Sequence, residues 1–219
     1  MQTSLDHPLP PDNFNKRNIS VQTLEVPTIL SRIYLTKDPE TSKPYSPIFF
    51  GASLPNRFDA PKQYGVLYAG MDEEVAFLEI FRGKVKSGFL YRDGALSAYS
   101  ISRLEIDRPL KLFRASGSNL ERMGANSGIF ATKNRWITQQ WSLAFWQHPA
   151  KVDGIIYPSC HDNERFCVAL FSDRINEALA VQSTEEILSD SFSDRLTEIT
   201  DTYGYTLLCS GEKAQHRSS

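Results

Sequence analysis

Three side chains that could act together on a phosphorylated, ring-bearing substrate lie in one short segment, residues 49–83. Arg57, Tyr68 and Glu79 follow one another at steps of eleven residues. A guanidinium group forms forked hydrogen bonds to phosphate, an aromatic face stacks on a planar ring, and a carboxylate stabilises positive charge that develops during a reaction. The pattern predicts a binding site if the turn, strand and helix expected here bring the three side chains together.

The elements expected to position these side chains are a strand followed directly by a helix. Tyr68 lies in the apolar run of residues 65–69, which is typical of a strand. Asp72 is a suitable N-cap and the two glutamates after it suit a positive first turn, so a helix is predicted over residues 73–82. Glu79 shares one side of this helix with small and apolar residues, which is unusual for a simple solvent-facing glutamate.

Two further candidates come from distant segments. Arg32 is a lone charge in the apolar run of residues 28–35, and a buried guanidinium needs a carboxylate or phosphate partner. Ser159 lies in a polar turn that also contains Cys160 and His161. Adjacent residues on a turn rarely reach the geometry of a serine or cysteine hydrolase, so the sequence does not favour that chemistry.

Each candidate also has a purely structural interpretation, which the sequence leaves open. Arg32 could form a structural salt bridge, Arg57 could be an ordinary surface arginine, and Tyr68 could belong to the core. Glu79 could pair with an arginine three residues later, an interaction that contributes only a few tenths of a kcal/mol. Ser159 could be an ordinary turn residue.

The composition is that of an ordinary globular protein. Hydrophobic residues make up 41% of the 219 residues and charged residues 23%, which suits one domain with a normal core. The formal net charge of −2 argues against nucleic acid as a direct partner, because such proteins usually carry a basic surplus. No apolar run reaches the roughly 20 residues that span a bilayer, and the N-terminus lacks the features of a signal peptide. We therefore expect a cytoplasmic protein without a membrane partner.

The cysteines and histidines predict neither disulfides nor a metal site. Cys160, Cys167 and Cys209 form no CxxC pair and are expected to be reduced, with Cys160 and Cys167 packed beside strands. The four histidines show no HExxH or similar spacing, so no metal is expected.

The order of elements along the chain favours a single α+β domain. Residues 1–20 are expected to form an extended arm, residues 21–175 the main domain, and residues 176–219 a helix and tail that pack on it. Helices are also predicted over residues 134–147 and 184–203. Strands are predicted at residues 28–35, 65–69, 100–106, 110–113, 152–157 and 165–171. Several blocks of strands with few helices between them favour α+β over a doubly wound parallel sheet.

A series of short motifs runs through the chain in a fixed order. They are SRIY with Arg32, FFG at residues 49–51, RFDAP at residues 57–61, YGVLYA at residues 64–69, AFLEIF with Glu79, DGIIYPS at residues 153–159 and CVALF at residues 167–171. In order and spacing the chain resembles the RES-domain family, toxins of bacterial toxin–antitoxin pairs named for an Arg, a Glu and a Ser. The resemblance runs from about residue 24 to residue 171. It departs at Asn56, where a glycine often precedes the loop arginine, and in the tail after Asp173, which does not align.

The resemblance implies a fold, an activity and a partner. The family is similar to ADP-ribosyltransferases, which implies split antiparallel β-sheets with flanking helices. Its characterised members degrade NAD by hydrolysis or phosphorolysis and are held inactive by an antitoxin of the Xre helix-turn-helix type. Carried over to this chain, the site residues are Arg32, Arg57, Tyr68, Glu79 and Ser159.

Cleavage of the nicotinamide–ribose bond builds positive charge on the ribose, and the implied residues suit that chemistry. Glu79 would stabilise the charge, while Arg32 and Arg57 would hold the diphosphate or an attacking inorganic phosphate. Tyr68 would stack on the nicotinamide ring. Ser159 would hydrogen-bond the amide of nicotinamide or a ribose hydroxyl. Catalysis is therefore assigned to Glu79, Arg57 and Ser159 and substrate binding to all but Glu79, with NAD as substrate, phosphate as a co-substrate candidate and no cofactor.

Two other functions stay open at this point. One is transfer of ADP-ribose to a protein target, which would use the same residues with a different acceptor. The other is a non-catalytic interaction module that keeps the fold. The sequence does not distinguish water, phosphate and protein as acceptors, and it leaves a homodimer open.

Overall fold

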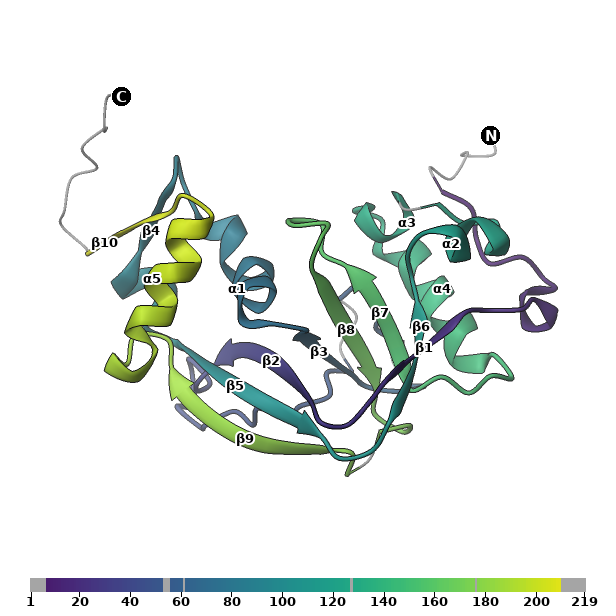
Figure 1. The fold of residues 1–219 in the computed structure, drawn as a ribbon, viewed down its shortest axis with the longest axis horizontal. Helices are drawn as coiled ribbons and strands as arrows, with labels where there is room; N and C mark the ends of the chain where they lie inside the picture. The colour runs from purple at the N-terminus through teal and green to yellow at the C-terminus, as the bar shows by residue number, and fades with distance from the viewer. Residues whose placement is uncertain (1–6, 53–55, 61, 127, 176, 210–219) are drawn as a thin grey trace.

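The computed structural model describes residues 7–52, 56–60, 62–126, 128–175 and 177–209 (Figure 1). Within these residues the chain forms a curled eight-stranded sheet of order β1-β6-β7-β8-β3-β2-β5-β9 and a small sheet that pairs β10 with β4. The strands are β1 Val21–Leu24, β2 Thr28–Leu35, β3 Val66–Gly70, β4 Phe89–Tyr91, β5 Tyr99–Ile106, β6 Leu110–Arg114, β7 Gly154–Pro158, β8 Phe166–Phe171, β9 Leu179–Glu186 and β10 Thr206–Leu208.

The helices lie in two groups at opposite ends of the curled sheet. They are α1 Glu73–Phe81, α2 Ser118–Met123, α3 Gly128–Ala131, α4 Arg135–Gln147 and α5 Ser193–Thr202. In Figure 1, α1 and α5 lie beside β2 and β5, whereas α2, α3 and α4 lie beside β6 and β7. None of the described helices is long and apolar enough to cross a lipid bilayer.

Alternating side chains of the central strands contribute to separate hydrophobic cores. On β8, Ala169 and Phe171 pack in the cluster that contains Trp141 of α4. Their neighbours Val168 and Leu170 belong to a second cluster, because successive residues of a strand point to opposite faces. Both faces of β8 are therefore buried, which explains why its sequence is apolar throughout.

The sheet is narrowest where β2 meets β3. Their ladder contains the single residue pair Ser31–Gly70, whereas β2 pairs with β5 from Thr28 to Leu35. This junction separates one half, β1-β6-β7-β8-β3, from the other, β2-β5-β9, and corresponds to the predicted split. The α+β class and the single-domain architecture are confirmed. The sheets were expected to be antiparallel, but two strand pairs, β6–β7 and β10–β4, are parallel.

The local predictions around the candidate site are confirmed, and one distant prediction is wrong. The strand at residues 28–35 is β2, and the helix predicted from residue 73 is α1, whose N-cap Asp72 accepts a 2.8 Å hydrogen bond from the Val75 amide. The helix predicted over residues 184–203 begins only at Ser193. Residues 184–186 instead end β9, which pairs with β5 along an otherwise open edge of the sheet.

The start of α1, including its N-cap, is tied by arginines to β5, to α5 and to the residue before β8. Glu73 pairs with Arg103 of β5 and with Arg195 of α5, whose Nε lies 2.8 Å from Glu73 Oε2. Arg165, which directly precedes β8, lies 2.8 Å from Asp72 Oδ2. Each pair is partly exposed and contributes little alone, but together they fix α1 relative to both halves of the sheet.

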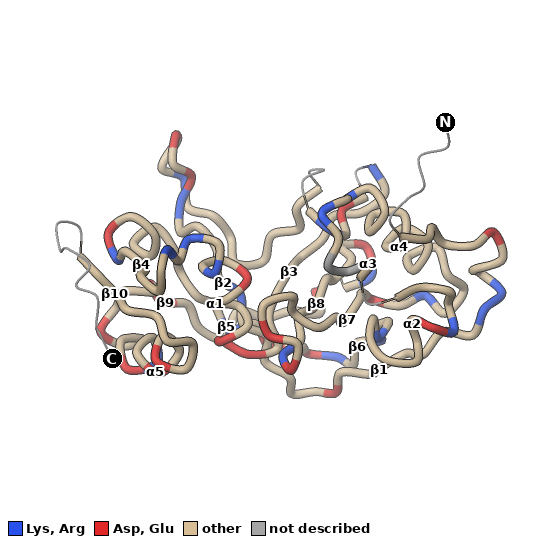
Figure 2. Tube along the Cα trace, turned by 90° about the horizontal axis from the view of Figure 1, so that it is seen from above, with Lys and Arg blue, Asp and Glu red and all other residues tan. Residues whose placement is uncertain are grey.

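Charged residues of both signs occur along both halves of the trace (Figure 2), in keeping with the net charge of −2. Basic residues are not gathered in one half of the trace. The arginines that hold α1 therefore act through their individual ion pairs, and not as part of a larger basic surface. Such ties are electrostatic and weaken as salt concentration rises.

Candidate active site

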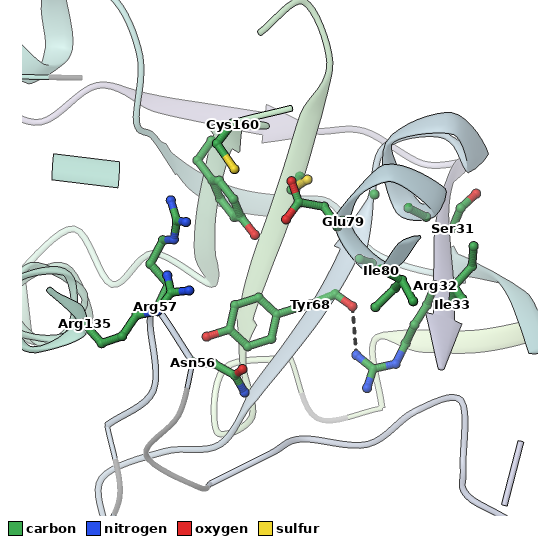
Figure 3. Close-up of a pocket in the computed structure, with 15 residues that line it drawn as sticks. Ser31, Arg32, Ile33, Asn56, Arg57, Tyr68, Glu79, Ile80, Arg135 and Cys160 are labelled. Atoms are coloured by element: carbon green, nitrogen blue, oxygen red, sulfur yellow. Dashed lines mark hydrogen bonds between the residues drawn. The ribbon is translucent and has the colours of Figure 1, made fainter. Parts of the chain in front are cut away.

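A pocket of about 380 Å³ opens at the junction of β2 and β3, beside α1 (Figure 3). Arg32, Arg57, Tyr68 and Glu79 all line this pocket. Ser159, the fifth predicted residue, is hydrogen-bonded to Glu79. The structure thus brings together all five residues from β2, the loop before β3, β3 itself, α1 and the turn after β7.

Glu79 extends from α1 into the pocket and is held there by Ser159. Val75 and Ala76, one turn earlier, are buried in the core, whereas Glu79 is exposed. Ser159 Oγ donates a 2.7 Å hydrogen bond to Glu79 Oε1. The turn that carries Ser159 therefore orients the carboxylate. The alternative partner considered from the sequence was Arg82, three residues after Glu79.

Ser159 is buried, with 3% of its surface exposed, and its hydroxyl is fully engaged. Its single proton is donated to Glu79, and its oxygen accepts a 3.1 Å bond from the backbone amide of His161. In this arrangement Ser159 positions the carboxylate, while its predicted contact with substrate stays a prediction. The geometry also gives no support to a serine nucleophile, because the hydroxyl faces a carboxylate rather than an imidazole.

Tyr68 lines the pocket with its ring and anchors a loop with its hydroxyl. Tyr68 Oη accepts a 2.9 Å bond from the Phe58 amide and donates a 2.9 Å bond to Asp59 Oδ1. Asp59 Oδ2 in turn accepts from the Asn56 amide at 3.1 Å. Burial raises the pKa of Tyr68 well above its usual value, so the hydroxyl stays protonated and serves as a donor. Tyr68 and Asp59 therefore fix the loop that carries Arg57.

The buried carboxyl group of Asp59 makes this anchor dependent on pH. Burial raises the pKa of Asp59 above its ordinary value of 3.8, while hydrogen bonds from Tyr68 and Asn56 oppose the rise. A raised folded-state pKa contributes stability that is complete below 3.8 and is lost as pH rises through the folded value. The hydrogen bond from Tyr68 limits that loss, because it favours the ionised form.

Tyr68→Phe is expected to destabilise the protein by about 1–3 kcal/mol at neutral pH, since it removes the donor to Asp59 Oδ1, while Oδ2 keeps the bond from the Asn56 amide. The loss should become smaller as pH falls, because protonation of Asp59, whose pKa is raised by burial, removes the buried charge that Tyr68 stabilises. Urea unfolding at the two pH values measures the difference. Tyr64→Phe is the matched control, because Tyr64 Oη bonds the Ser142 hydroxyl at 2.7 Å instead of a carboxylate. An equal pH dependence in both variants would contradict the assigned role of Asp59.

Arg32 is partly buried and has spare hydrogen-bonding capacity. Its Nη1 donates a 2.8 Å bond to the Tyr68 carbonyl oxygen, and its Nε is buried without a partner among the described residues. Burial lowers the pKa of Arg32 to about 10, since desolvation disfavours the charged form. Within the described part of the chain no carboxylate forms an ion pair with Arg32, so the structural salt bridge is not found there.

Arg57 shares its side of the pocket with a residue that the sequence did not single out. In Figure 3 the side chains of Arg57 and Arg135 lie near each other, with Tyr68 between them and Arg32. Arg135 is an exposed arginine at the start of α4, and no local signal marks it. The loop is also held from α4, because Gln139 Nε2 donates a 2.9 Å bond to the Asn56 carbonyl oxygen.

The cysteines near the pocket behave differently from each other. Cys167 is buried as predicted, and burial raises the pKa of its thiol far above the usual value, which makes it a poor nucleophile. Cys160, also predicted to be packed, is exposed and lines the pocket. It lies in the turn after β7, where the chain leaves the sheet. No disulfide joins any of these three cysteines, all of which lie in the described part of the chain.

Known proteins resemble this chain in sequence. The model of the RES domain family matches residues 29–191, a range that extends beyond the last sequence motif, at residues 167–171, and includes β9. The chain is 31% identical over 123 residues to the probable toxin y4kH of Sinorhizobium fredii, and the alignment covers 56% of this chain and 94% of that protein.

A solved structure shows the same fold. A chain in the crystal structure of the M. tuberculosis MbcT–MbcA toxin–antitoxin complex superposes with a TM-score of 0.58 at 13% identity, covering 80% of this chain and 92% of that chain. At this identity the likeness concerns the fold alone. The family model matches most of the length of this chain, and the relative is more than 30% identical to it. This chain therefore belongs to the RES domain family.

Proposed function

We propose that this protein is an NAD-degrading toxin that cleaves the nicotinamide–ribose bond and is held inactive by an antitoxin. The observation that carries the proposal is Glu79, whose carboxylate faces a pocket that also contains the guanidinium groups of Arg32, Arg57 and Arg135. A dinucleotide needs cationic donors for its phosphates and a carboxylate beside the reacting sugar. Membership of the RES domain family and the relative named a probable toxin support the toxin part.

The proposed reaction breaks the bond between ribose C1′ and the nicotinamide nitrogen, and the electron pair leaves with nicotinamide. Positive charge then develops on the ribose, where the Glu79 carboxylate stabilises it. The bond from Ser159 keeps the carboxylate in place, so little reorganisation is needed as the charge appears. Water then bonds to C1′ and yields ADP-ribose and a proton, or phosphate bonds there and yields ADP-ribose-1″-phosphate.

The remaining side chains would bind and orient the substrate. Arg57 and Arg135 lie on one side of Tyr68, where two forked donors suit the diphosphate. Arg32 lines the pocket on the other side, where its guanidinium group would bind a phosphate oxygen of NAD or inorganic phosphate. The ring of Tyr68, held by its hydroxyl, would stack on nicotinamide.

The proposal extends to a protein partner. The structural neighbour comes from a toxin–antitoxin complex, which supports an antitoxin for this chain as well. We propose an antitoxin of the Xre helix-turn-helix type and action in the cytoplasm, where NAD is available. Co-purification of the chain with the product of a neighbouring small open reading frame, and loss of NAD cleavage in that complex, would support this part.

Incubation of the purified protein with NAD, with and without inorganic phosphate, tests the proposed activity. Mass spectrometry is expected to detect nicotinamide together with ADP-ribose, or with ADP-ribose-1″-phosphate when phosphate is present. A mass increase of an added protein in place of these products would instead indicate ADP-ribosyl transfer. No loss of NAD and no heat of NAD binding in a calorimetric titration would indicate a non-catalytic module and overturn the proposal.

A further inference from the structure

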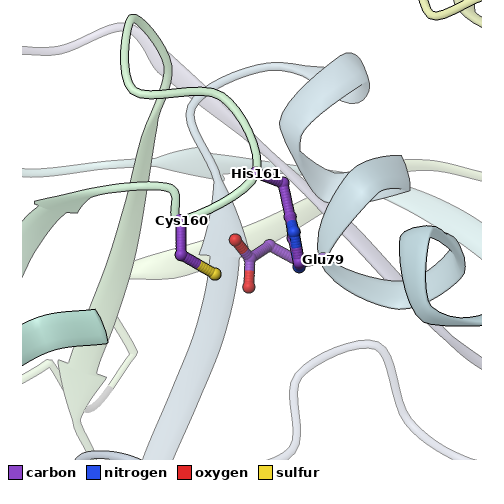
Figure 4. Close-up of side chains that lie close together, drawn as sticks. All are labelled: Glu79, Cys160 and His161. Atoms are coloured by element: carbon purple, nitrogen blue, oxygen red, sulfur yellow. The ribbon is translucent and has the colours of Figure 1, made fainter. Parts of the chain in front are cut away.

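Three side chains with different metal-binding atoms meet at the edge of the pocket. A carboxylate oxygen of Glu79, the Sγ of Cys160 and a ring nitrogen of His161 all lie within 4.8 Å of one another (Figure 4). All three residues are exposed, so an ion can reach them from solvent. Two of them are adjacent in the turn after β7, and the third comes from α1.

The donor set suits zinc in particular. One thiolate, one imidazole and one carboxylate are the ligand types of Zn²⁺, and three protein ligands leave the fourth position to water. Zinc–ligand bonds of roughly 2.0–2.3 Å separate neighbouring donors in a tetrahedral site by about 3.3–3.8 Å. Side-chain rotations that move the donor atoms by about 1 Å would bring them to that separation, and exposed side chains make such rotations readily.

The surroundings of Glu79 favour a metal ligand as well. Ser159 donates to Oε1, which leaves Oε2 for an ion and holds the carboxylate in one orientation. Hydrogen bonds of this kind to a ligating carboxylate are typical of metal sites and strengthen them. The neighbouring Cys167 is buried with a raised thiol pKa, so it does not compete for the ion.

We infer that Glu79, Cys160 and His161 form an inhibitory site for Zn²⁺ at the mouth of the pocket. The bound ion takes the Glu79 carboxylate out of the reaction and adds positive charge where charge must develop on the substrate. Zinc therefore blocks NAD cleavage and its removal restores it. The inhibitory effect rests on the proposed function, whereas the binding of the ion does not.

Binding is measured first, on the full chain without NAD. Calorimetric titration with Zn²⁺ is expected to give one ion per chain, and Co²⁺ in its place is expected to give thiolate-to-cobalt charge-transfer absorption. Cys160→Ser should abolish that absorption and weaken zinc binding by at least about tenfold. Loss of a residue that only hydrogen-bonds to a metal ligand already weakens binding by about tenfold or more, and loss of a ligand should weaken it at least as much. Cys209→Ser removes another exposed thiol and should change neither result. Absence of the absorption in the unmodified chain, or its persistence in Cys160→Ser, overturns the site.

Inhibition is measured second, as NAD loss at increasing Zn²⁺ with reversal by EDTA. Half-inhibition is expected at the zinc dissociation constant of the first experiment, and His161→Gln should shift both to higher zinc by at least about tenfold. Zinc binding without NAD cleavage in zinc-free protein would keep the site and refute the proposed function. Cleavage that persists with zinc bound would refute inhibition.

Discussion

Replacing Glu79 with glutamine is expected to lower the rate of NAD cleavage by about 10²–10³, or roughly 3–4 kcal/mol of barrier. Glutamine keeps the size of the side chain and can still accept the hydrogen bond from Ser159, so the change removes mainly the negative charge. Glu79 is exposed, and its carboxylate lies outside the core clusters. The fold should therefore survive, and the effect should fall on turnover rather than on expression or melting temperature.

The measurement is the initial rate of nicotinamide release by equal amounts of purified protein, with melting temperatures recorded in parallel. Glu121→Gln is the matched control, because Glu121 is an exposed helical glutamate on α2, outside the pocket lining. It should retain the full rate. A Glu79→Gln protein that releases nicotinamide at a near wild-type rate would remove Glu79 from the mechanism.

Gly70→Ala is expected to give the largest loss of stability among single methyl additions at the site. Gly70 ends β3, forms the ladder pair with Ser31 and precedes the N-cap of α1. An added Cβ would lie 2.6 Å from Val75 Cγ1, 2.7 Å from the Asp72 carbonyl oxygen and 2.9 Å from the Ala76 amide nitrogen. Two of these atoms belong to the backbone and cannot rotate away, so the turn between β3 and α1 must open.

Overpacking of this kind costs about 1–3 kcal/mol or more, which corresponds to a fall in melting temperature of roughly 3–10 °C for a chain of this size. Activity should fall as well, because α1 carries Glu79. Gly83→Ala is the control, since an added Cβ there has no described atom within 4 Å. Its melting temperature should stay close to that of the unmodified chain. Equal melting temperatures for the two variants would contradict the expected clash and show that the turn at Gly70 accommodates an added methyl group.

The elements predicted correctly from sequence are those that carry their own local signals. The run at residues 28–35 is apolar enough to be a strand anywhere, and Asp72 with the glutamates after it marks the start of α1. The end of β9, from residue 184, was predicted as part of a helix, and this stretch is polar and ends in two glutamates. Most of its side chains are at least partly exposed, and its strand conformation depends on pairing with β5, about 80 residues earlier. A contact of that range leaves no trace in the local pattern.

The site follows the same rule. The family motifs identified Arg32, Arg57, Tyr68, Glu79 and Ser159, and the structure brings them together. Asp59 could have been found, since it lies in the RFDAP motif two residues after Arg57. Arg135 and the meeting of Cys160 with Glu79 could not, because the contacts join segments about 80 residues apart through the curl of the sheet.

The narrow junction between β2 and β3 makes one side chain serve two purposes. Besides the ladder pair Ser31–Gly70, the two strands are tied by the bond from Arg32 to the Tyr68 carbonyl oxygen. The same arginine lines the pocket. A molecule that binds Arg32 on one side of the pocket and Arg57 on the other would connect the two halves of the sheet. Ligand binding would therefore also make the sheet more rigid at this junction.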